Sequence, residues 1–259
     1  MKTTHINSNN TIFSVLLIAI LTFFTSCDKN DAEIEDIANI SQNEIKFDFN
    51  QFGKTHNDYL AYVWNIKDRD NAEARFNHGL TFVDPTFGSF NKGQKFEDID
   101  VEFHLQRVDA ILEGTYNAER EKLSKPMTNF LNKLAETTKK ASDNEVTVAE
   151  FKNQIATIEK EIYNSERIQI DIKKGVSNDG AAMLAITSIL KYSTEYWVTF
   201  DNNGDGDIGN TPLRKGKIKR ALADAWGYVS AWTNNGDGSY SWSHESALVN
   251  ADCVSDSVR

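Results

Sequence analysis

Apolar residues recur every three or four positions through most of the chain after residue 55, which is the pattern of amphipathic helices. The clearest case follows Thr147 and Glu150, which form a capping box at a helix start. The apolar stripe that comes next covers two heptads, so it favours packing into a bundle core and is too short for a separate coiled coil. Its members are Val148, Phe151, Ile155, Ile158 and Ile162.

The same periodicity predicts further helices along the chain. We expect Thr55 to cap a helix at 56–66, Gly114 to end a helix at 100–112, and Pro126 to precede a helix at 127–141. Residues 166–173 alternate like a strand, but no neighbouring segment looks like a hairpin partner. The fold class is therefore mainly α, a helical bundle. Besides the helix after Thr147, the expected helices cover 56–66, 71–82, 100–112, 127–141, 181–200 and 218–232.

A continuous apolar run at residues 12–24 predicts where the chain functions. It is about 13 residues long, which is short of the roughly 20 that span a bilayer and typical of a signal-peptide core. Thr25 and Ser26 then precede Cys27, which fits a lipoprotein signal whose thiol receives a diacylglyceryl group. We expect residues 1–26 to be removed and Cys27 to be lipidated. An uncleaved anchor, an ordinary secretory signal and a buried helix of the fold are the alternatives.

The segment 27–51 is acidic and has no sustained period, which favours a tether between the membrane and the folded domain. The acids directly after Cys27 resemble the signal that marks envelope lipoproteins of the Bacteroidota type for surface export, and a merely solvated linker is the other interpretation. The expected organisation is a signal peptide at 1–26, a tether at 27–51 and a helical domain at 52–259 with loops at 201–212 and 233–244.

Composition supports a folded domain outside the cytoplasm that does not depend on disulfides. Apolar residues make up 40% of the chain and its net charge is −10. Loss of residues 1–26 removes one cation, Lys2, and no acid, which makes the mature net charge −11. Such a balance disfavours nucleic acid as a partner, because phosphates need basic surface. With Cys27 acylated, Cys253 has no partner for an intramolecular disulfide.

Three short motifs also carry a resemblance. An HN-x-x-L start lies within 53–60, a Ser-x-x-Tyr-Trp helix within 186–197 and a small-residue Asp-x-x-Gly segment within 223–227, with Glu150-Phe151 between the first two. Together they resemble a loose group of uncharacterised Bacteroidota envelope lipoproteins. The resemblance implies an envelope location and no particular activity, and the chain departs from the group in a tail that is not rich in glycine and alanine.

The loop 201–212 resembles a degenerate calcium loop of the EF-hand or dockerin type. Gly206 stands at the sharp turn that such loops require, but Pro212 stands where a carboxylate closes the site, so calcium binding is expected to be weak. The other interpretation is a solvated loop in which Asn, Asp and Gly only form turns. The candidate calcium ligands are Asp201, Asn203, Asp205, the carbonyl of Asp207, and Gly209.

A second copy of this pattern, at 233–238, is a weaker candidate for a metal site. Thr233 is a poor first ligand, and His244 stands at the closing position with Glu245 one step late. The chain has no zinc spacing, no serine-nucleophile elbow and no phosphate-binding glycine loop. Its scattered histidines after the signal are His56, His78, His104 and His244.

Two surface features complete the candidate chemistry. Cations at 214–220 predict a solvated helix face that balances the acidic loop, or else a contact with lipid head groups. Aromatic residues near the C-terminus predict core and interface contacts, or else a platform that stacks on a glycan. These aromatic residues are Trp226, Tyr228, Trp232, Tyr240 and Trp242.

The leading functional hypothesis is a membrane-anchored envelope lipoprotein, a binding or structural module of the outer membrane on its periplasmic or surface side, with an envelope protein or glycan as partner. The alternative is an extracytoplasmic hydrolase whose site is assembled from dispersed His, Asp and Glu. A pocket in which His56 or His104 meets two carboxylates favours the hydrolase.

Overall fold

The computed structural model describes residues 47–89, 99–144, 146–201 and 208–258, all of which belong to the unit 45–259. The predictions for the signal peptide and for Cys27 lie outside these residues. Within the described segments, no helix combines the length and the apolar character needed to cross a bilayer.

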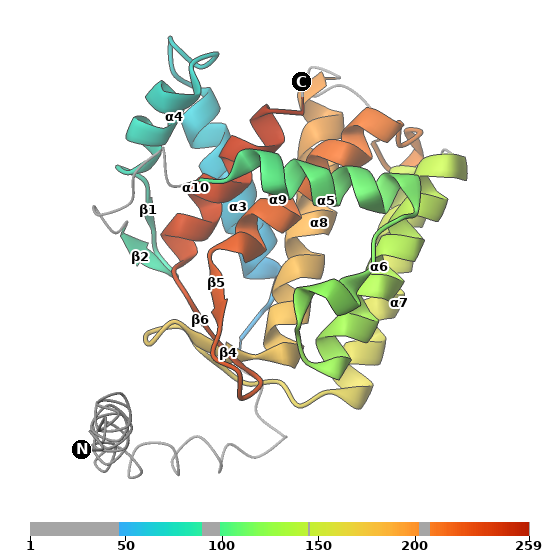
Figure 1. Cartoon of the computed structure of the whole chain (residues 1–259). Coiled ribbons are helices and arrows are strands. Elements are labelled where there is room, and N and C mark those ends of the chain that lie inside the picture. Colours follow the sequence, from blue (N-terminus) through green and yellow to red (C-terminus); the bar gives the residue numbers. More distant parts are fainter. Residues whose placement is uncertain (1–46, 90–98, 145, 202–207, 259) are drawn as a thin grey trace, which may run out of the picture. The chain divides into compact units, whose positions relative to one another are not determined.

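The fold is mainly α, as predicted, and its helices pack as a bundle (Figure 1). The described residues contain eight α-helices: α3 (Asn50–Trp64), α4 (Ala72–Gly79), α5 (Val101–Glu113), α6 (Lys125–Asn144), α7 (Val148–Ser165), α8 (Asp179–Asp201), α9 (Lys215–Ser230) and α10 (His244–Asp256).

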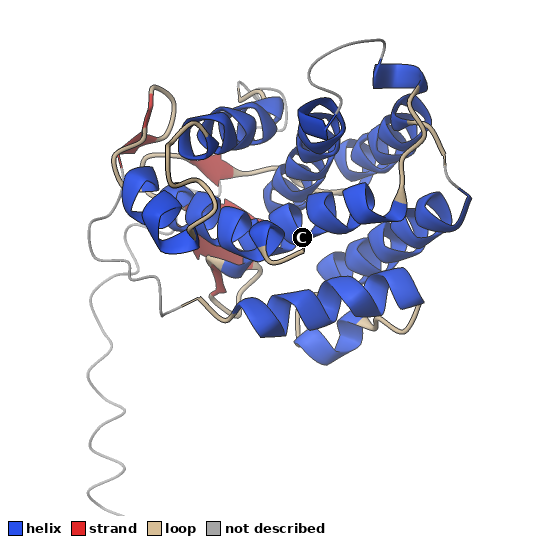
Figure 2. Cartoon of the chain, turned by 90° about the horizontal axis from the view of Figure 1, so that it is seen from above, coloured by secondary structure: helices blue, strands red, loops and turns tan. Residues whose placement is uncertain are grey.

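Helix α8 is the central element of the bundle. Every side chain from 181 to 190 is buried, which is expected of a helix that is apolar on all sides. It contacts α3, α7 and α9, while α9 also packs against α5 and α10 (Figures 1 and 2). The core therefore surrounds α8 and α9.

Two glycines allow helices to approach closely. A Cβ atom at Gly227 of α9 would lie 2.6 Å from the carbonyl oxygen of Asn250 and 2.8 Å from Cα of Ala251, both in α10. A Cβ atom at Gly53 of α3 would lie 2.6 Å from the carbonyl oxygen of Ser188 in α8. Glycine is unfavourable inside an isolated helix, so its presence here reflects the close contact between backbones.

Several predicted helix ends are confirmed. The side chain of Asp100 caps α5, which ends at Gly114 in the left-handed conformation with φ 76°. Thr147 and Glu150 form the predicted capping box of α7. The prediction that Pro126 precedes its helix is wrong: α6 begins at Lys125, and Pro126 lies in the first turn, where its missing amide donor is not needed.

The start of α3 differs from the prediction. The helix begins at Asn50, whose backbone amide donates to Oδ1 of Asp48, so Thr55 lies inside the helix and is buried. The Thr55 hydroxyl donates instead to Oδ2 of Asp84 at 2.8 Å. Phe49 is buried in the core, and the folded domain therefore begins within the last residues of the segment expected to be a tether.

The prediction that 166–173 has no partner strand is wrong. Strand β3 (Ile170–Asp171) pairs with β4 (Val176–Asn178), and β4 pairs with β6 (Ser239–Trp242), which pairs with β5 (Trp232–Asn234). All pairs are antiparallel, and the strands are too short for a period to be visible in the sequence. A separate hairpin joins β1 (Val83–Asp84) and β2 (Gly88–Ser89), and in Figure 1 it lies at the left edge, apart from β4, β5 and β6.

Candidate functional site

Most of the predicted calcium loop lies outside the described residues. This applies to Asn203, Asp205 and Asp207, and to the side chain of Asp201, the last residue of α8. Gly209 lies in a short 3₁₀ helix, η5 (Ile208–Asn210). Pro212, the closing position, forms an isolated antiparallel bridge with Thr147. Calcium binding at 201–212 stays a prediction.

The second glycine-rich loop is the turn of a β-hairpin between β5 and β6. Asn234 Oδ1 accepts from the amide of Gly236 at 2.8 Å, and Asp237 Oδ1 accepts from the amide of Ser239 at 2.9 Å. Gly236 and Gly238 have φ angles of 84° and 83°, which favour glycine. These side chains serve the turn, and no group of three or more His, Cys, Asp or Glu residues in the described segments is placed to hold a metal ion.

Three of the cations in the segment 214–220 make contacts within the fold. Lys217 Nζ donates to the carbonyl oxygen of Trp197 at 3.0 Å, and the Arg220 guanidinium lies 4.0 Å from the centre of the Trp197 ring. Lys219 forms an ion pair with Asp109 at 2.6 Å. These three cations link α9 to α8 and α5.

The three motifs that carry the resemblance meet at one buried carboxylate, Asp224 of α9. His56 Nε2 of α3 lies 3.4 Å from Asp224 Oδ1. From α8, Trp197 Nε1 donates to Asp224 Oδ2 at 2.6 Å, and the Ser193 hydroxyl donates to the same oxygen. All four side chains are buried. The cluster ties the three central helices together.

This cluster lacks the arrangement of a nucleophilic site. The Ser193 hydroxyl donates to Asp224, whereas in the serine–histidine–aspartate triad the serine donates to the histidine. None of the four side chains lines any of the hollows described below. A neighbouring buried histidine, His244, contacts the Tyr228 hydroxyl through Nδ1 at 2.5 Å and stacks on Phe87. Burial lowers the pKa of His244 well below its ordinary value.

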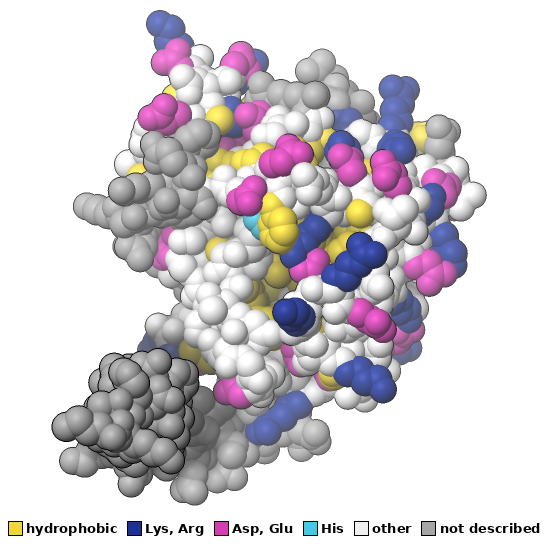
Figure 3. All heavy atoms as spheres, viewed as in Figure 1, with side chains coloured by type: hydrophobic (Ala, Val, Ile, Leu, Met, Phe, Trp, Pro, Cys, Tyr) yellow, Lys and Arg dark blue, Asp and Glu magenta, His cyan; other side chains and the backbone are white. Residues whose placement is uncertain are grey.

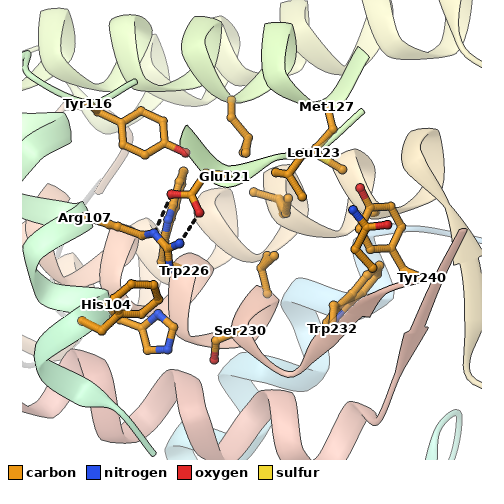
Figure 4. A pocket seen from close by; sticks show the side chains of 16 residues that line it. His104, Arg107, Tyr116, Glu121, Leu123, Met127, Trp226, Ser230, Trp232 and Tyr240 are labelled. Atoms are coloured by element: carbon orange, nitrogen blue, oxygen red, sulfur yellow. Dashed lines mark hydrogen bonds and ion pairs between the residues drawn. The ribbon is translucent and has the colours of Figure 1, made fainter. Parts of the chain in front are cut away.

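A hollow of about 240 Å³ lies between α5, α6, α8, α9 and the β5–β6 hairpin (Figure 4). On the face of Figure 3, apolar side chains show in a depression that is bordered by Lys, Arg, Asp and Glu. An engineered apolar cavity of about 150 Å³ holds benzene, so this hollow has room for a ring with a short substituent. We take it as the candidate site.

Most of the wall is apolar and aromatic. Trp226 forms one side and is in edge-to-face contact with Tyr116, with ring centres 5.7 Å apart. Trp232 and Tyr240 lie at the opposite end from His104 and Arg107 (Figure 4). The aliphatic part of the wall consists of Leu123, Met127, Leu131, Ala182, Ile186 and Val229.

The polar end of the hollow contains a two-point ion pair. Arg107 Nε donates to Glu121 Oε1 at 2.6 Å, and Arg107 Nη2 donates to Glu121 Oε2. The Phe103 ring covers the guanidinium plane, with its centre 3.8 Å from Cζ. Glu121 ends a short 3₁₀ helix, η4 (Ala118–Glu121), which carries the carboxylate to α5.

Three residues of this wall each contain a buried polar atom that has no hydrogen-bond partner among the described residues. These atoms are His104 Nδ1, the Tyr116 hydroxyl and Trp232 Nε1. Burial, reinforced by the positive charge of Arg107, lowers the pKa of His104 to about 4, so the ring is neutral at pH 7. Burial also raises the pKa of the Tyr116 phenol, which therefore keeps its proton. Unpartnered buried polar atoms are rare in native proteins, and a bound molecule is one way to satisfy them.

The sequence analysis found only part of this site. It singled out Trp226, Trp232 and Tyr240 as an aromatic cluster and His104 as a scattered histidine, but not the hollow that they share. Arg107, Tyr116 and Glu121 were missed. His104 and Arg107 are three positions apart and therefore share a helix face, whereas Tyr116 and Glu121 lie in irregular segments that carry no periodic signal.

Comparison with known proteins gives no assignment: no protein-family model, curated protein or solved structure gives a significant match to the chain.

Proposed function

We propose that this chain is an exported binding protein of the cell envelope, held at the membrane by lipid on Cys27, whose helical domain binds a small ring-bearing molecule. The observation that carries the proposal is the hollow beside α5 and α9, whose lining residues His104, Tyr116 and Trp232 each have a buried polar atom without a partner in the described part of the chain. The ligand lies against Trp226 and offers hydrogen-bond acceptors to the polar wall.

The size and lining of the hollow support a compact ligand. Pockets for small molecules combine apolar and aromatic walls with a few placed polar groups. Flat rings pack well against Trp226, and Trp232 is donor-only at its Nε1. The hydrolase alternative lacks comparable support in the described segments, because His104 Nδ1 has no partner and His56 is buried in the cluster around Asp224.

Binding is tested by calorimetric titration of the full-length Cys27→Ser chain with indole and 4-methylphenol, two uncharged ring compounds. We expect a dissociation constant on the order of 1 mM or tighter for compounds of this size. Ala182→Leu places a larger side chain into the hollow and is expected to abolish binding, whereas Ala156→Leu on the exposed face of α7 leaves it unchanged. Absence of binding to the parent chain, or equal binding to the Ala182→Leu chain, contradicts the proposal.

Lipid anchoring is tested separately in cells. Cys27→Ser removes the thiol that receives the lipid, so we expect the protein to move from the membrane fraction to the soluble fraction of the envelope. Cys253→Ser is the matched control, because that thiol is buried in α10 and lies in the folded domain. If the Cys27→Ser protein stays in the membrane fraction, Cys27 is not the anchor.

A further inference from the structure

The guanidinium of Arg107 is held in place with one edge unused. Glu121 occupies the Nε and Nη2 side, and the Phe103 ring covers one face. Nη1 has no hydrogen-bond partner among the described residues. A guanidinium carries five N–H donors, and the edge formed by Nη1 and Nη2 presents two parallel donors that match the two oxygens of a carboxylate.

The other unpartnered polar atoms of the lining residues also favour a ligand that accepts hydrogen bonds. Near Arg107, the Tyr116 phenol keeps its proton and is able to donate. At the opposite end of the hollow (Figure 4), Trp232 Nε1 is only a donor. His104 supplies a donor or an acceptor according to its tautomer. Donors thus outnumber acceptors on this wall, and both oxygens of Glu121 already accept from Arg107.

From this arrangement we propose that the ligand of the hollow is an organic monocarboxylate, whose carboxylate binds the free edge of Arg107 while its ring or compact apolar body lies against Trp226. The inference rests on the proposed function and names the chemical class of the ligand. Glu121 acts as a positioning residue, since it fixes the guanidinium plane without covering the Nη1 edge.

The position of Arg107 favours a charged head group. Phe103, Arg107, Tyr116 and Glu121 also line a second, smaller hollow of about 160 Å³. The Arg107–Glu121 pair therefore lies between the two hollows, and its side chains retain exposures of 23% and 18%. A carboxylate at this point keeps partial access to water, so its desolvation cost is smaller than at a fully buried position.

The charges at this end also exclude other head groups. A dianionic phosphate would face one guanidinium and the negative charge of Glu121, which is an unfavourable balance. An ammonium would face Arg107, while the oxygens of Glu121 are already engaged. One planar monoanion is the group that matches a single unused guanidinium edge.

The test compares three probes that share one ring: 4-hydroxyphenylacetate, its uncharged amide 4-hydroxyphenylacetamide, and the cation tyramine. Each is titrated by calorimetry into the full-length Cys27→Ser chain. We expect the carboxylate to bind at least about tenfold more tightly than the amide, because a hydrogen bond to a charged group adds this much, and tyramine to bind most weakly.

Arg107 is tested with two variants. Arg107→Lys keeps the charge but removes the planar edge, and the double replacement Arg107→Gln with Glu121→Gln removes both charges without leaving either unpaired. Both variants are expected to lose the preference for the carboxylate, by about tenfold or more, and to bind the amide as the parent chain does. The double variant keeps the test valid if a single change at Arg107 disturbs folding.

The outcomes separate the two proposals. If carboxylate and amide bind equally, or tyramine binds best, the hollow is a binding site but the carboxylate inference is wrong. The same conclusion follows if both Arg107 variants retain the preference. If none of the three probes binds and the uncharged rings also fail, the proposed function is wrong and the inference falls with it.

Discussion

Replacing Asp224 by alanine is expected to lower the free energy of unfolding by about 2–6 kcal/mol, since each of the two buried donors that loses its acceptor costs about 1–3 kcal/mol. The change leaves Trp197 Nε1 and the Ser193 hydroxyl without their acceptor in a site that water does not reach. Urea denaturation followed by circular dichroism measures the loss.

Two further variants show whether this loss belongs to the cluster. Ser193→Ala removes one donor and leaves the bond from Trp197, so it should cost less than Asp224→Ala. Glu161→Ala breaks an exposed ion pair with Lys133 and should cost at most about 1 kcal/mol. If Asp224→Ala costs no more than Glu161→Ala, Asp224 does not hold the three central helices together.

Replacing Arg75 by methionine is the second change for which we expect a large loss, about 3–5 kcal/mol. The Arg75 side chain is buried, lies 3.1 Å from Asp252 and 2.6 Å from Asp256 of α10, and stacks over Trp64 with Cζ 4.4 Å from the ring centre. Without it, the carboxylate of Asp252 stays buried beside Trp64 without a counter-charge. Burial already raises the pKa of Asp252 while Arg75 opposes that rise, which shows the direction of the cost.

The double replacement Arg75→Met with Asp252→Asn is the control for this network. It removes the buried charge together with its partner, and an asparagine oxygen still accepts from Trp64 Nε1. We therefore expect the double variant to be more stable than Arg75→Met alone, measured by the same denaturation. Equal stability of the two variants would mean that the loss comes from packing and not from an uncompensated charge.

The fold was predictable where periodic apolar residues and helix caps agree. The box of Thr147 and Glu150 and the stripe after it define α7, and Asp100 with Gly114 defines α5. Helix α10 was not predicted, because many of its residues are Ser, Asn, Asp, Val or Cys, which have low helix propensity. Packing against α9 at Gly227 and burial of Leu248 and its neighbours hold α10 in place, which is tertiary information.

The candidate site was less predictable for a similar reason. Arg107 and Trp232 are far apart in the chain, and only the packing of α5 against α9 brings their elements to one hollow. Arg75 lies in a short helix where a sequence pattern places arginine on the surface. Spacing rules describe one element at a time, and neither this buried ion pair nor the shared hollow belongs to one element.

The motifs behind the resemblance gain a physical explanation. His56, Ser193, Trp197 and Asp224 form one buried cluster, and Gly227 lets α9 approach α10. These residue types are therefore required by packing and by hydrogen bonding in the core. Membership of the envelope group stays a prediction, since the same requirements arise in any bundle with this cluster.

The most direct test of the central claim is a nitrogen–proton NMR titration of the five tryptophan indole groups with 4-hydroxyphenylacetate. Trp64 and Trp197 donate to the buried Asp252 and Asp224, whereas Trp232 lines the hollow and its Nε1 has no hydrogen-bond partner among the residues that the structure describes. The account predicts that the Trp232 signal, assigned with Trp232→Phe, shifts on titration while the signals of Trp64 and Trp197 stay in place. An unchanged Trp232 signal at saturating ligand, or equal shifts at Trp64 and Trp197, would contradict it.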